Sequence, residues 1–415
     1  MTDLLRALEQ NDAIPFHMPG HKRNAALLGG ALPYALDITE IEDFDNLHNP
    51  QGILLDIMER ARKYWGSDGA YLSVNGSTGS ILAGVRAITR PGDTVLMARN
   101  CHIAVWHAVE LCGLQPVILE PEWIDDWGIY GAVTQETLDQ AMEECSEANC
   151  PPQACVLTSP TYEGIRSELR CPIPLLVDAA HGAHLPLPNA DMTVMSLHKT
   201  LPALTQTALL HVRGARVDRK RLERQLRIFQ TSSPSYVLLA SIGQCVALLE
   251  KHPEWFDAWE RRLDMFYAHA RQWKNLCLFD QEHDRGKLLL RCDAGFAAAF
   301  LRAKRIEPEY ARENLLLLMT SPCDTNGMME QLTRALDELD GACPPAPCPL
   351  PPAPCLQAPD MNCLALPHET VPAEEAVGRV CAEYIWECPP GVPVWLPGQR
   401  IDRPVEGREW VEVVK

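Results

Sequence analysis

Residues 175–200 read LLVDAAHGAHLPLPNADMTVMSLHKT and hold two short, mostly apolar runs. These runs, 175–178 and 192–196, are typical of strands that helices cover on both faces. Asp178 ends the first run, and Lys199 closely follows the second. Open α/β sheets bind their ligands at the carboxyl ends of parallel strands. We therefore predict an α/β fold with a mainly parallel sheet, with Asp178 and Lys199 at one edge.

Short apolar runs alternate with amphipathic segments on either side of this region, as expected for βα units. Residues 75–79 are predicted to form a turn before the first helix. Beyond residue 236 the pattern becomes mainly helical, with two further strands. The predicted strands are 70–74, 94–98, 116–119, 154–158, 208–212, 288–291 and 315–319, beside the two above. The predicted helices are 80–89, 101–112, 237–250, 253–273 and 326–339.

The sequence divides into four predicted parts. An N-terminal segment and a large domain occupy residues 1–245, and a small α+β domain occupies 246–342. Residues 343–360 are rich in proline and cysteine, and we interpret them as a stiff, extended connector. The C-terminal segment, 361–415, contains one predicted helix at 373–384 and a tail rich in proline and glycine.

Composition argues against several classes of protein. The 415 residues carry a formal net charge of −18, whereas a nucleic-acid partner requires a basic face. No apolar run approaches the roughly 20 residues that a membrane helix needs. The N-terminus lacks the basic start and the apolar core of a signal peptide. We therefore expect a cytoplasmic protein with no nucleic-acid or membrane partner.

Sixteen cysteines are scattered along the chain, and no C-x-x-C pair occurs. Without an export signal, free thiols are expected rather than a disulfide framework. Cys343, Cys348 and Cys355 form a local cluster whose spacing matches no zinc pattern. We interpret these three as exposed or weakly packed thiols, and we expect no metal site.

Residues 74–80 read VNGSTGS and join a predicted strand to a predicted helix. Gly76 lies in the turn. Free N–H groups at the start of the helix, with the hydroxyls of Ser77 and Thr78, would form a site for an anion. An ordinary helix N-cap explains the same residues equally well, since serine and threonine favour that position.

Asp178 and Lys199 indicate which anion this could be. A carboxylate at the end of a buried strand is costly unless it meets a cation, such as the protonated pyridine of pyridoxal phosphate (PLP). A lysine that forms imines needs partial burial or neighbouring cations. Taken singly, Asp178 could cap a helix and Lys199 could be an ordinary surface lysine. The order of anion turn, strand-end aspartate and Ser-x-His-Lys predicts a PLP site.

Further short motifs follow one another along the chain. They are PGHK at 19–22, NGST at 75–78, RNCH at 99–102, SPTYEG at 159–164, DAAHG at 178–182, HKTLPALTQ at 198–206, SSPSY at 232–236, GR at 378–379 and PPGVP at 389–393. In these motifs the chain resembles the short form of the ornithine/lysine/arginine decarboxylase family of PLP enzymes. The resemblance implies the PLP-dependent transferase-like fold, that is, fold type I, which aspartate aminotransferase also has.

The resemblance implies catalytic roles for four residues. Lys199 would carry PLP as a Schiff base, Asp178 would pair with the pyridine nitrogen, and His102 would stack on the ring. Lys199 or His198 would return a proton to the substrate. Without the family, His102 could equally be a histidine at a helix N-terminus with no role.

Other residues are implied around the cofactor, the substrate and a second subunit. Thr231 and Ser232 would reach the phosphate of the neighbouring subunit, which predicts a homodimer or larger assembly with shared active sites. Tyr162 and Glu163 would lie near the substrate, an amino acid. The remaining residues implied to bind the cofactor are Gly76, Ser77, Thr78, His181 and Ser196, beside His102, Asp178, His198 and Lys199.

Three positions depart from the family pattern. Ala179, Arg312 and Gln399 stand where the family usually has acidic residues. A substrate with a cationic side chain favours carboxylates nearby, so these departures leave the identity of the substrate open.

The main hypothesis is PLP-dependent α-decarboxylation of a basic L-amino acid (arginine, lysine or ornithine) to the corresponding amine. One alternative is another PLP-dependent reaction, such as transamination or elimination, which the cofactor residues alone do not separate from decarboxylation. A second is a PLP-binding protein with little turnover. A keto acid product would favour the first alternative, and the absence of released CO2 would favour the second.

Overall fold

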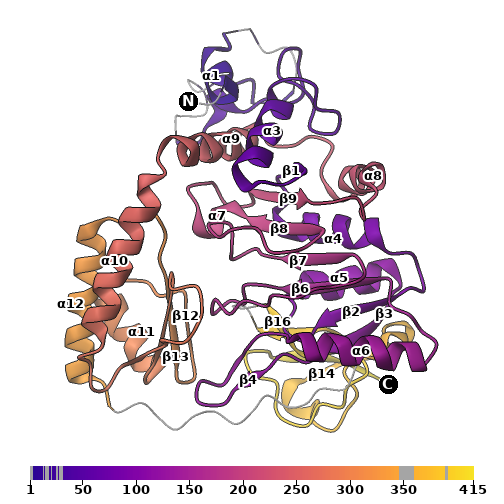
Figure 1. The fold of residues 1–415 in the computed structure, drawn as a ribbon. Coiled ribbons are helices and arrows are strands. Elements are labelled where there is room, and N and C mark those ends of the chain that lie inside the picture. Colours follow the sequence, from indigo (N-terminus) through magenta and orange to yellow (C-terminus); the bar gives the residue numbers. More distant parts are fainter. Residues whose placement is uncertain are drawn as a thin grey trace.

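The largest unit of the computed structural model is a seven-stranded sheet flanked by helices (Figure 1). The structure describes residues 3–12, 14, 18–19, 21–24, 27, 31–344, 359–387 and 391–415. The strands, in their order across the sheet, are β1 (Gly69–Ser73), β9 (Ala208–Val212), β8 (Met192–Ser196), β7 (Leu175–Asp178), β6 (Ala154–Thr158), β2 (Thr94–Ala98) and β3 (Gln115–Leu119).

All strands of this sheet except β9 run in the same direction. β9 is antiparallel to both of its neighbours, β1 and β8, and the other pairs are parallel. The carboxyl ends of β1, β7 and β8 therefore meet at one edge. The predicted α/β fold with a mainly parallel sheet is confirmed, and each predicted strand lies within one residue of its expected bounds.

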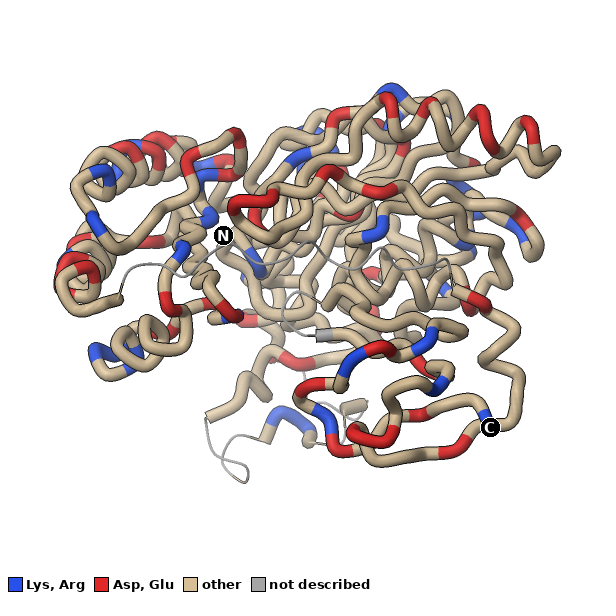
Figure 2. The backbone as a smooth tube through the Cα atoms, turned by 90° about the horizontal axis from the view of Figure 1, so that it is seen from below, with Lys and Arg blue, Asp and Glu red and all other residues tan. Residues whose placement is uncertain are grey.

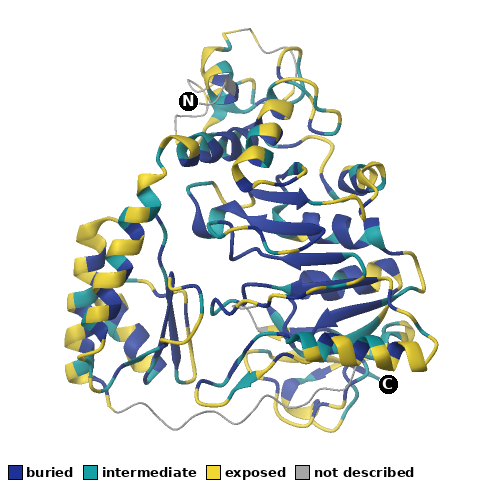
Figure 3. Ribbon diagram, viewed as in Figure 1, coloured by how far each residue is buried: buried dark blue, intermediate teal, exposed yellow. Residues whose placement is uncertain are grey.

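Helices bury the apolar side chains of the sheet in two cores, which the ribbon in Figure 3 shows as dark blue. Successive side chains of a strand point to opposite faces, so Val194 of β8 lies in the first core and Met195 in the second. The first core takes side chains from α4 (Gly76–Ile88), α5 (Ile103–Cys112), α6 (Gln135–Glu147) and α8 (Arg219–Phe229). The second takes them from α1 (Asp3–Gln10), α3 (Ile53–Trp65) and α9 (Tyr236–Lys251).

The helix α4 begins four residues before the predicted start at Ser80. Gly76 adopts φ of +67°, a left-handed conformation that glycine enters without steric penalty. The chain can therefore turn from β1 into the helix almost at once. The prediction of a turn over residues 75–79 is wrong for most of that segment, because Gly76 to Gly79 already belong to the helix.

The residues after α9 form a smaller α+β unit, which Figure 1 shows on the side of the large sheet where α7 (Leu197–Thr200) lies. Its antiparallel sheet has the order β10 (Cys277–Leu278), β11 (Lys287–Arg291), β13 (Leu315–Met319) and β12 (Tyr310–Arg312). The helices are α10 (Glu254–Ala270), α11 (Ala294–Ala303) and α12 (Asn326–Ala342), and they share a core with this sheet.

The predicted helix at 373–384 is wrong. The segment contains only the short 3-10 helix η3 (Ala373–Glu375), followed by a turn at residues 377–378 and isolated β-bridges at Val380 and Cys381. Gly378 adopts φ of +87°, which interrupts a helix, and the backbone of Cys381 pairs with distant chain instead. Long-range pairing has therefore overridden a weak local helix preference. The strands here are β14 (His368–Pro372), β15 (Ile385–Glu387), β16 (Val392–Trp395) and β17 (Trp410–Val414).

Three predictions concern residues outside the described ranges. Most of the proline-rich connector, including Cys348 and Cys355, lies there, as do Gly20 and the two prolines 389 and 390 of the motifs. Cys343 is described, and it is buried in the core of the small unit at the end of α12, so its prediction as an exposed or weakly packed thiol is wrong.

Charges are mixed over the chain. Figure 2 shows Lys and Arg interspersed with the more numerous Asp and Glu along the described backbone. Within the described ranges, no helix combines the length and the apolar character that crossing a membrane requires.

Candidate active site

Asp178 and Lys199 lie at the ends of adjacent strands. Asp178 is the last residue of β7 and is buried, and its Oδ1 accepts a hydrogen bond from the Ala180 N–H at 3.1 Å. Lys199 lies in α7, the single turn that directly follows β8. Burial raises the pKa of the Asp178 carboxyl, although the charge of Lys199 opposes this effect. The two side chains that the sequence singled out are thus close enough to interact electrostatically.

His181 contacts Lys199 directly. The Nε2 atom of His181 lies 2.9 Å from the Nζ atom of Lys199, and the imidazole packs against the ring of Tyr162 with a centroid separation of 4.2 Å. Burial holds the pKa of His181 well below its usual value, and the charges of Lys287 and Lys199 add to the effect. His181 is therefore a neutral imidazole that can donate one hydrogen bond and accept another.

His102 is the N-cap of α5, where its Nδ1 accepts from the Ala104 N–H at 3.1 Å. Gly391 covers its ring: a Cβ atom on Gly391 would lie 2.7 Å from His102 Cδ2. Burial, together with the charge of Lys199, lowers the pKa of His102 to about 4. The position of His102 is thus compatible with a histidine that only caps a helix and with one that stacks on the cofactor, because it caps α5 and also lies within electrostatic reach of Lys199.

Hydroxyl groups and N–H groups surround the start of α4 and the end of β8. Ser77 is half-buried and Thr78 is exposed in the first turn of α4, behind the left-handed Gly76. The Ser196 Oγ atom is buried and has no hydrogen-bond partner among the described residues. An orphaned buried hydroxyl is costly unless a ligand completes it. His198 binds the Thr207 carbonyl through Nδ1 at 3.0 Å, which leaves its Nε2 as the accepting nitrogen.

Tyr162 and Glu163 connect the large sheet to the small unit. The Tyr162 hydroxyl donates to the Glu309 carboxylate, and the Tyr310 hydroxyl donates to Glu163 Oε1 at 3.2 Å. Burial raises the pKa of Glu163. Glu309 therefore lies beside the predicted substrate residue Tyr162, and with Glu163 it gives this region two carboxyl groups, which offsets part of the acidic character lost at Arg312.

Gln399 occupies a buried position, where its Oε1 accepts from the Leu396 N–H at 2.8 Å and holds a tight turn. This departure from the family pattern therefore has a structural role in the C-terminal segment. Ala179 is also buried, directly after β7.

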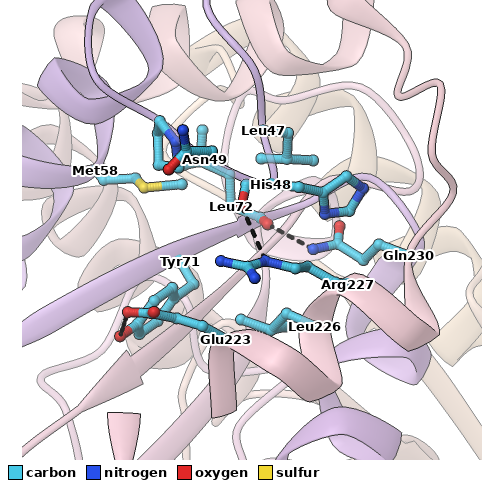
Figure 4. A pocket seen from close by; sticks show the side chains of 11 residues that line it. Leu47, His48, Asn49, Met58, Tyr71, Leu72, Glu223, Leu226, Arg227 and Gln230 are labelled. Atoms are coloured by element: carbon cyan, nitrogen blue, oxygen red, sulfur yellow. Dashed lines mark hydrogen bonds between the residues drawn. The ribbon is translucent and has the colours of Figure 1, made fainter. Parts of the chain in front are cut away.

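Thr231 and Ser232 follow Phe229 and Gln230, which accept hydrogen bonds from Asn75 and Val74 just before α4. Thr231 and Ser232 are exposed in the segment between α8 and α9, and the Thr231 carbonyl accepts from His48 Nε2 at 2.8 Å. Next to them is a cavity of about 210 Å³ that opens to solvent (Figure 4). Its lining residues are Leu47, His48, Asn49, Pro50, Met58, Tyr71, Leu72, Glu223, Leu226, Arg227 and Gln230.

Three residues with buried side chains where the small unit meets the large sheet were not predicted from the sequence. Lys287 is 1% exposed and its Nζ lies 3.2 Å from His181 Nδ1. Asp284 Oδ2 lies 3.1 Å from His184 Nε2, and both side chains are buried. The available signal was a lysine that opens an almost wholly apolar strand, KLLLR at 287–291. No sequence feature near this strand indicated that Lys287 would lie close to Lys199.

Comparison with known proteins identifies related sequences over the whole chain. The family model described as "Orn/Lys/Arg decarboxylase, major domain" matches residues 1–272. The uncharacterized protein YaaO of Bacillus subtilis is 32% identical over 97% of this chain and 92% of its own length. An arginine decarboxylase of Halalkalibacterium halodurans is 30% identical over 94% of this chain and 89% of its own.

Solved structures match the fold. The lysine decarboxylase of Francisella novicida superposes with a TM-score of 0.80, covering 100% of this chain and 81% of that one, at 17% sequence identity. At that identity the match speaks for the fold alone, and it confirms fold type I. The residues above also fit PLP chemically, since they provide a lysine, a buried carboxylate and an unpartnered hydroxyl at one edge of the sheet.

Proposed function

Because the chain belongs to the Orn/Lys/Arg decarboxylase family, we propose that it removes the α-carboxyl group of a basic L-amino acid and releases the corresponding amine. Membership also makes the chain a decarboxylase with PLP as its cofactor. The observation that carries the proposal is the position of Asp178 and Lys199 at the ends of neighbouring strands, with His181 Nε2 2.9 Å from Lys199 Nζ.

Residues of this chain would hold the cofactor at each of its polar groups. Lys199 would bind it covalently, Asp178 would face the ring nitrogen, His102 would cover the ring, and His181 would lie beside the ring hydroxyl. When bound, the cofactor supplies an electron sink for the bond that breaks. The residues proposed around its phosphate are Gly76, Ser77, Thr78, Ser196 and His198, with Thr231 and Ser232 from a second subunit.

Asp178 contributes a negative charge that is already desolvated and fixed. A preorganised charge of this kind stabilises a developing positive charge without the cost of reorganising solvent. Its raised pKa shows that the site penalises an unpaired carboxylate, so a cation opposite Asp178 is favoured.

Either of two groups would return a proton to the substrate carbon that loses CO2. Lys199 Nζ is one candidate, because His181 Nε2 lies 2.9 Å from it and the imidazole can take up or pass on a proton. His198 could do so through Nε2 once that nitrogen has taken up a proton, because its Nδ1–H is bound to the Thr207 carbonyl. Either group would act as a general acid, and the measured pH profile would separate them.

The side chain of the substrate would extend toward the small unit. Glu163 and Glu309, held by Tyr310 and Tyr162, provide two carboxylates that suit a cationic side chain. Arginine is the first candidate, since several relatives of 28–30% identity are arginine decarboxylases.

The test is a product assay. The purified protein with added PLP is incubated separately with arginine, lysine and ornithine, and released CO2 is measured together with agmatine, cadaverine and putrescine. We expect one amine in equal amount to CO2, and none from Lys199→Ala. A keto acid without CO2 would indicate transamination instead, and PLP binding without either product would contradict the proposed reaction.

A further inference from the structure

Lys287 is a buried lysine outside the set that the family resemblance implies. It is the first residue of β11 in the small unit, and its side chain crosses to the large sheet. Its Nζ lies 3.2 Å from His181 Nδ1 and 3.5 Å from Met319 Sδ. Burying an ammonium group costs several kcal/mol unless charged or polar partners compensate, so this placement calls for a reason.

His181 lies between two lysines. Its Nδ1 faces Lys287 at 3.2 Å and its Nε2 faces Lys199 at 2.9 Å. A neutral imidazole has one N–H donor and one accepting nitrogen, whereas an ammonium group can only donate. If both lysines were protonated, His181 would have to accept at both nitrogens, which it cannot do. The geometry therefore requires that at least one of the two lysines is neutral.

The surrounding charges favour Lys287 as the charged one. The carboxylates of Asp284, Glu309 and Glu163 face Lys287 and favour its ammonium form, against burial and the charge of Lys199. Asp284 is held ionised: although burial raises its pKa, the hydrogen bond and charge of His184 and the charge of Lys287 lower it overall.

Lys199 has different surroundings. The groups that interact with it include the carboxyl of Asp178, the imidazoles of His102, His181 and His198, and Lys287 itself. Burial raises the pKa of the Asp178 carboxyl, so this group is a weaker partner for an ammonium group than an ordinary aspartate would be. Because His181 cannot accept from two ammonium groups, a charged Lys287 leaves Lys199 as the neutral lysine.

We propose that Lys287 is a positioning residue that acts through His181 to keep Lys199 as a neutral amine. A charged Lys287 donates to Nδ1, which fixes the ring proton on Nε2, and Nε2–H then donates to the lone pair of the Lys199 amine. The charge of Lys287 also disfavours a second ammonium group close by. Cations near an imine-forming lysine are a known way to make it nucleophilic at neutral pH.

The inference rests on the proposed function, because it concerns the lysine assigned to carry PLP. It also gives the small unit a part in the chemistry: β11 must be docked against the large sheet before Lys287 can reach His181. The amine of Lys199 is thus fully reactive only in the assembled chain.

The test measures the reactivity of Lys199 against pH in the protein without cofactor. Trinitrobenzenesulfonate reacts with neutral amines, and peptide mapping assigns the modified lysine. We compare wild type with Lys287→Met, which removes the charge, Lys287→Arg, which keeps it, and Lys304→Met. Lys304 pairs with Glu338 on the surface of the small unit and serves as the control.

We expect Lys287→Met to shift the midpoint of Lys199 modification upward by about one pH unit, which slows the reaction by up to about tenfold at pH values below the midpoint. Lys287→Arg should restore most of the rate, and Lys304→Met should leave it unchanged. Thermal unfolding checks the fold, and Lys287→Gln repeats the test if the methionine variant does not fold. Equal pH profiles for wild type and a folded uncharged variant would overturn the inference.

A second probe separates this inference from the proposed function. PLP followed by borohydride labels a lysine that binds the cofactor covalently. If wild type is labelled at Lys199 but Lys287→Met shows an unchanged trinitrophenylation profile, the inference is wrong and the proposed function stands. If the profile shifts as expected but PLP never labels Lys199, the inference stands and the proposed function is wrong.

Discussion

Asp178 is the residue on which the proposed chemistry depends most directly, since its carboxylate is buried at the end of β7. We expect Asp178→Asn to keep covalent PLP binding at Lys199 but to lose about a hundredfold or more in turnover, because an amide cannot hold a proton on the ring nitrogen. Absorbance and borohydride labelling report the attachment, and CO2 release reports turnover. Near wild-type turnover would mean that Asp178 has a structural role only.

Lys287 should also affect how the free energy of unfolding depends on pH. Burial lowers the pKa of Lys287 from 10.5 to about 8, so between these values the unfolded chain binds a proton that the folded chain does not. Stability therefore rises with pH across this window, by on the order of 3 kcal/mol for this group alone. Lys287→Met should remove the rise. Urea unfolding of wild type and Lys287→Met at pH 7.5 and pH 10 measures this rise. An equal rise in the free energy of unfolding in both proteins would contradict the prediction.

At the scale of the elements, the C-terminal segment meets the large sheet at Gly391, just before β16. Gly391 has φ of +81°, and a Cβ there would meet the His102 ring at 2.7 Å. Gly407 has a similar φ of +72° but open space around it, so Gly407→Ala is a matched control for the cost of the backbone conformation.

We expect Gly391→Ala to weaken PLP binding as well as stability, because His102 must move. Gly407→Ala should lower the melting temperature only, through about 1–2 kcal/mol of backbone strain. Fluorescence titration with PLP and thermal unfolding separate the two effects. Equal PLP affinity in both variants would show that the contact between Gly391 and His102 has no part in binding the cofactor.

The elements differ in how far the sequence could predict them. The parallel strands were predictable because each is a short apolar run that depends on burial from both faces, and β7 and β8 occur where expected. The helix expected at 373–384 failed, since the backbone of this segment pairs with residues near 400 and 413. Asp178 and Lys199 were found from local patterns. Lys287 was not, because its relation to His181 exists only after the two units dock.

At the scale of the whole molecule, Thr231 and Ser232 are the residues that a single chain does not explain. They are exposed on the segment between α8 and α9, beside the cavity of Figure 4. We therefore propose that they complete the phosphate site of a second subunit, so that each active site needs two chains. An assembly of this kind predicts that activity and PLP content fall together as the protein is diluted.

Complementation between inactive chains tests the shared site. A Lys199→Ala chain keeps an intact Thr231 and Ser232, and a Thr231→Ala/Ser232→Ala chain keeps an intact Lys199. In a hybrid dimer one of the two sites is then complete, so random mixing should recover about a quarter of the wild-type activity. Mixing Lys199→Ala with Asp178→Asn is the matched control, because both changes fall in the same half of the site and every hybrid site carries a defect. Recovery in the first mixture and not in the second is the expected result. A fully active monomer by light scattering, or no recovery in hybrids verified by mass, would show that each chain builds its site alone.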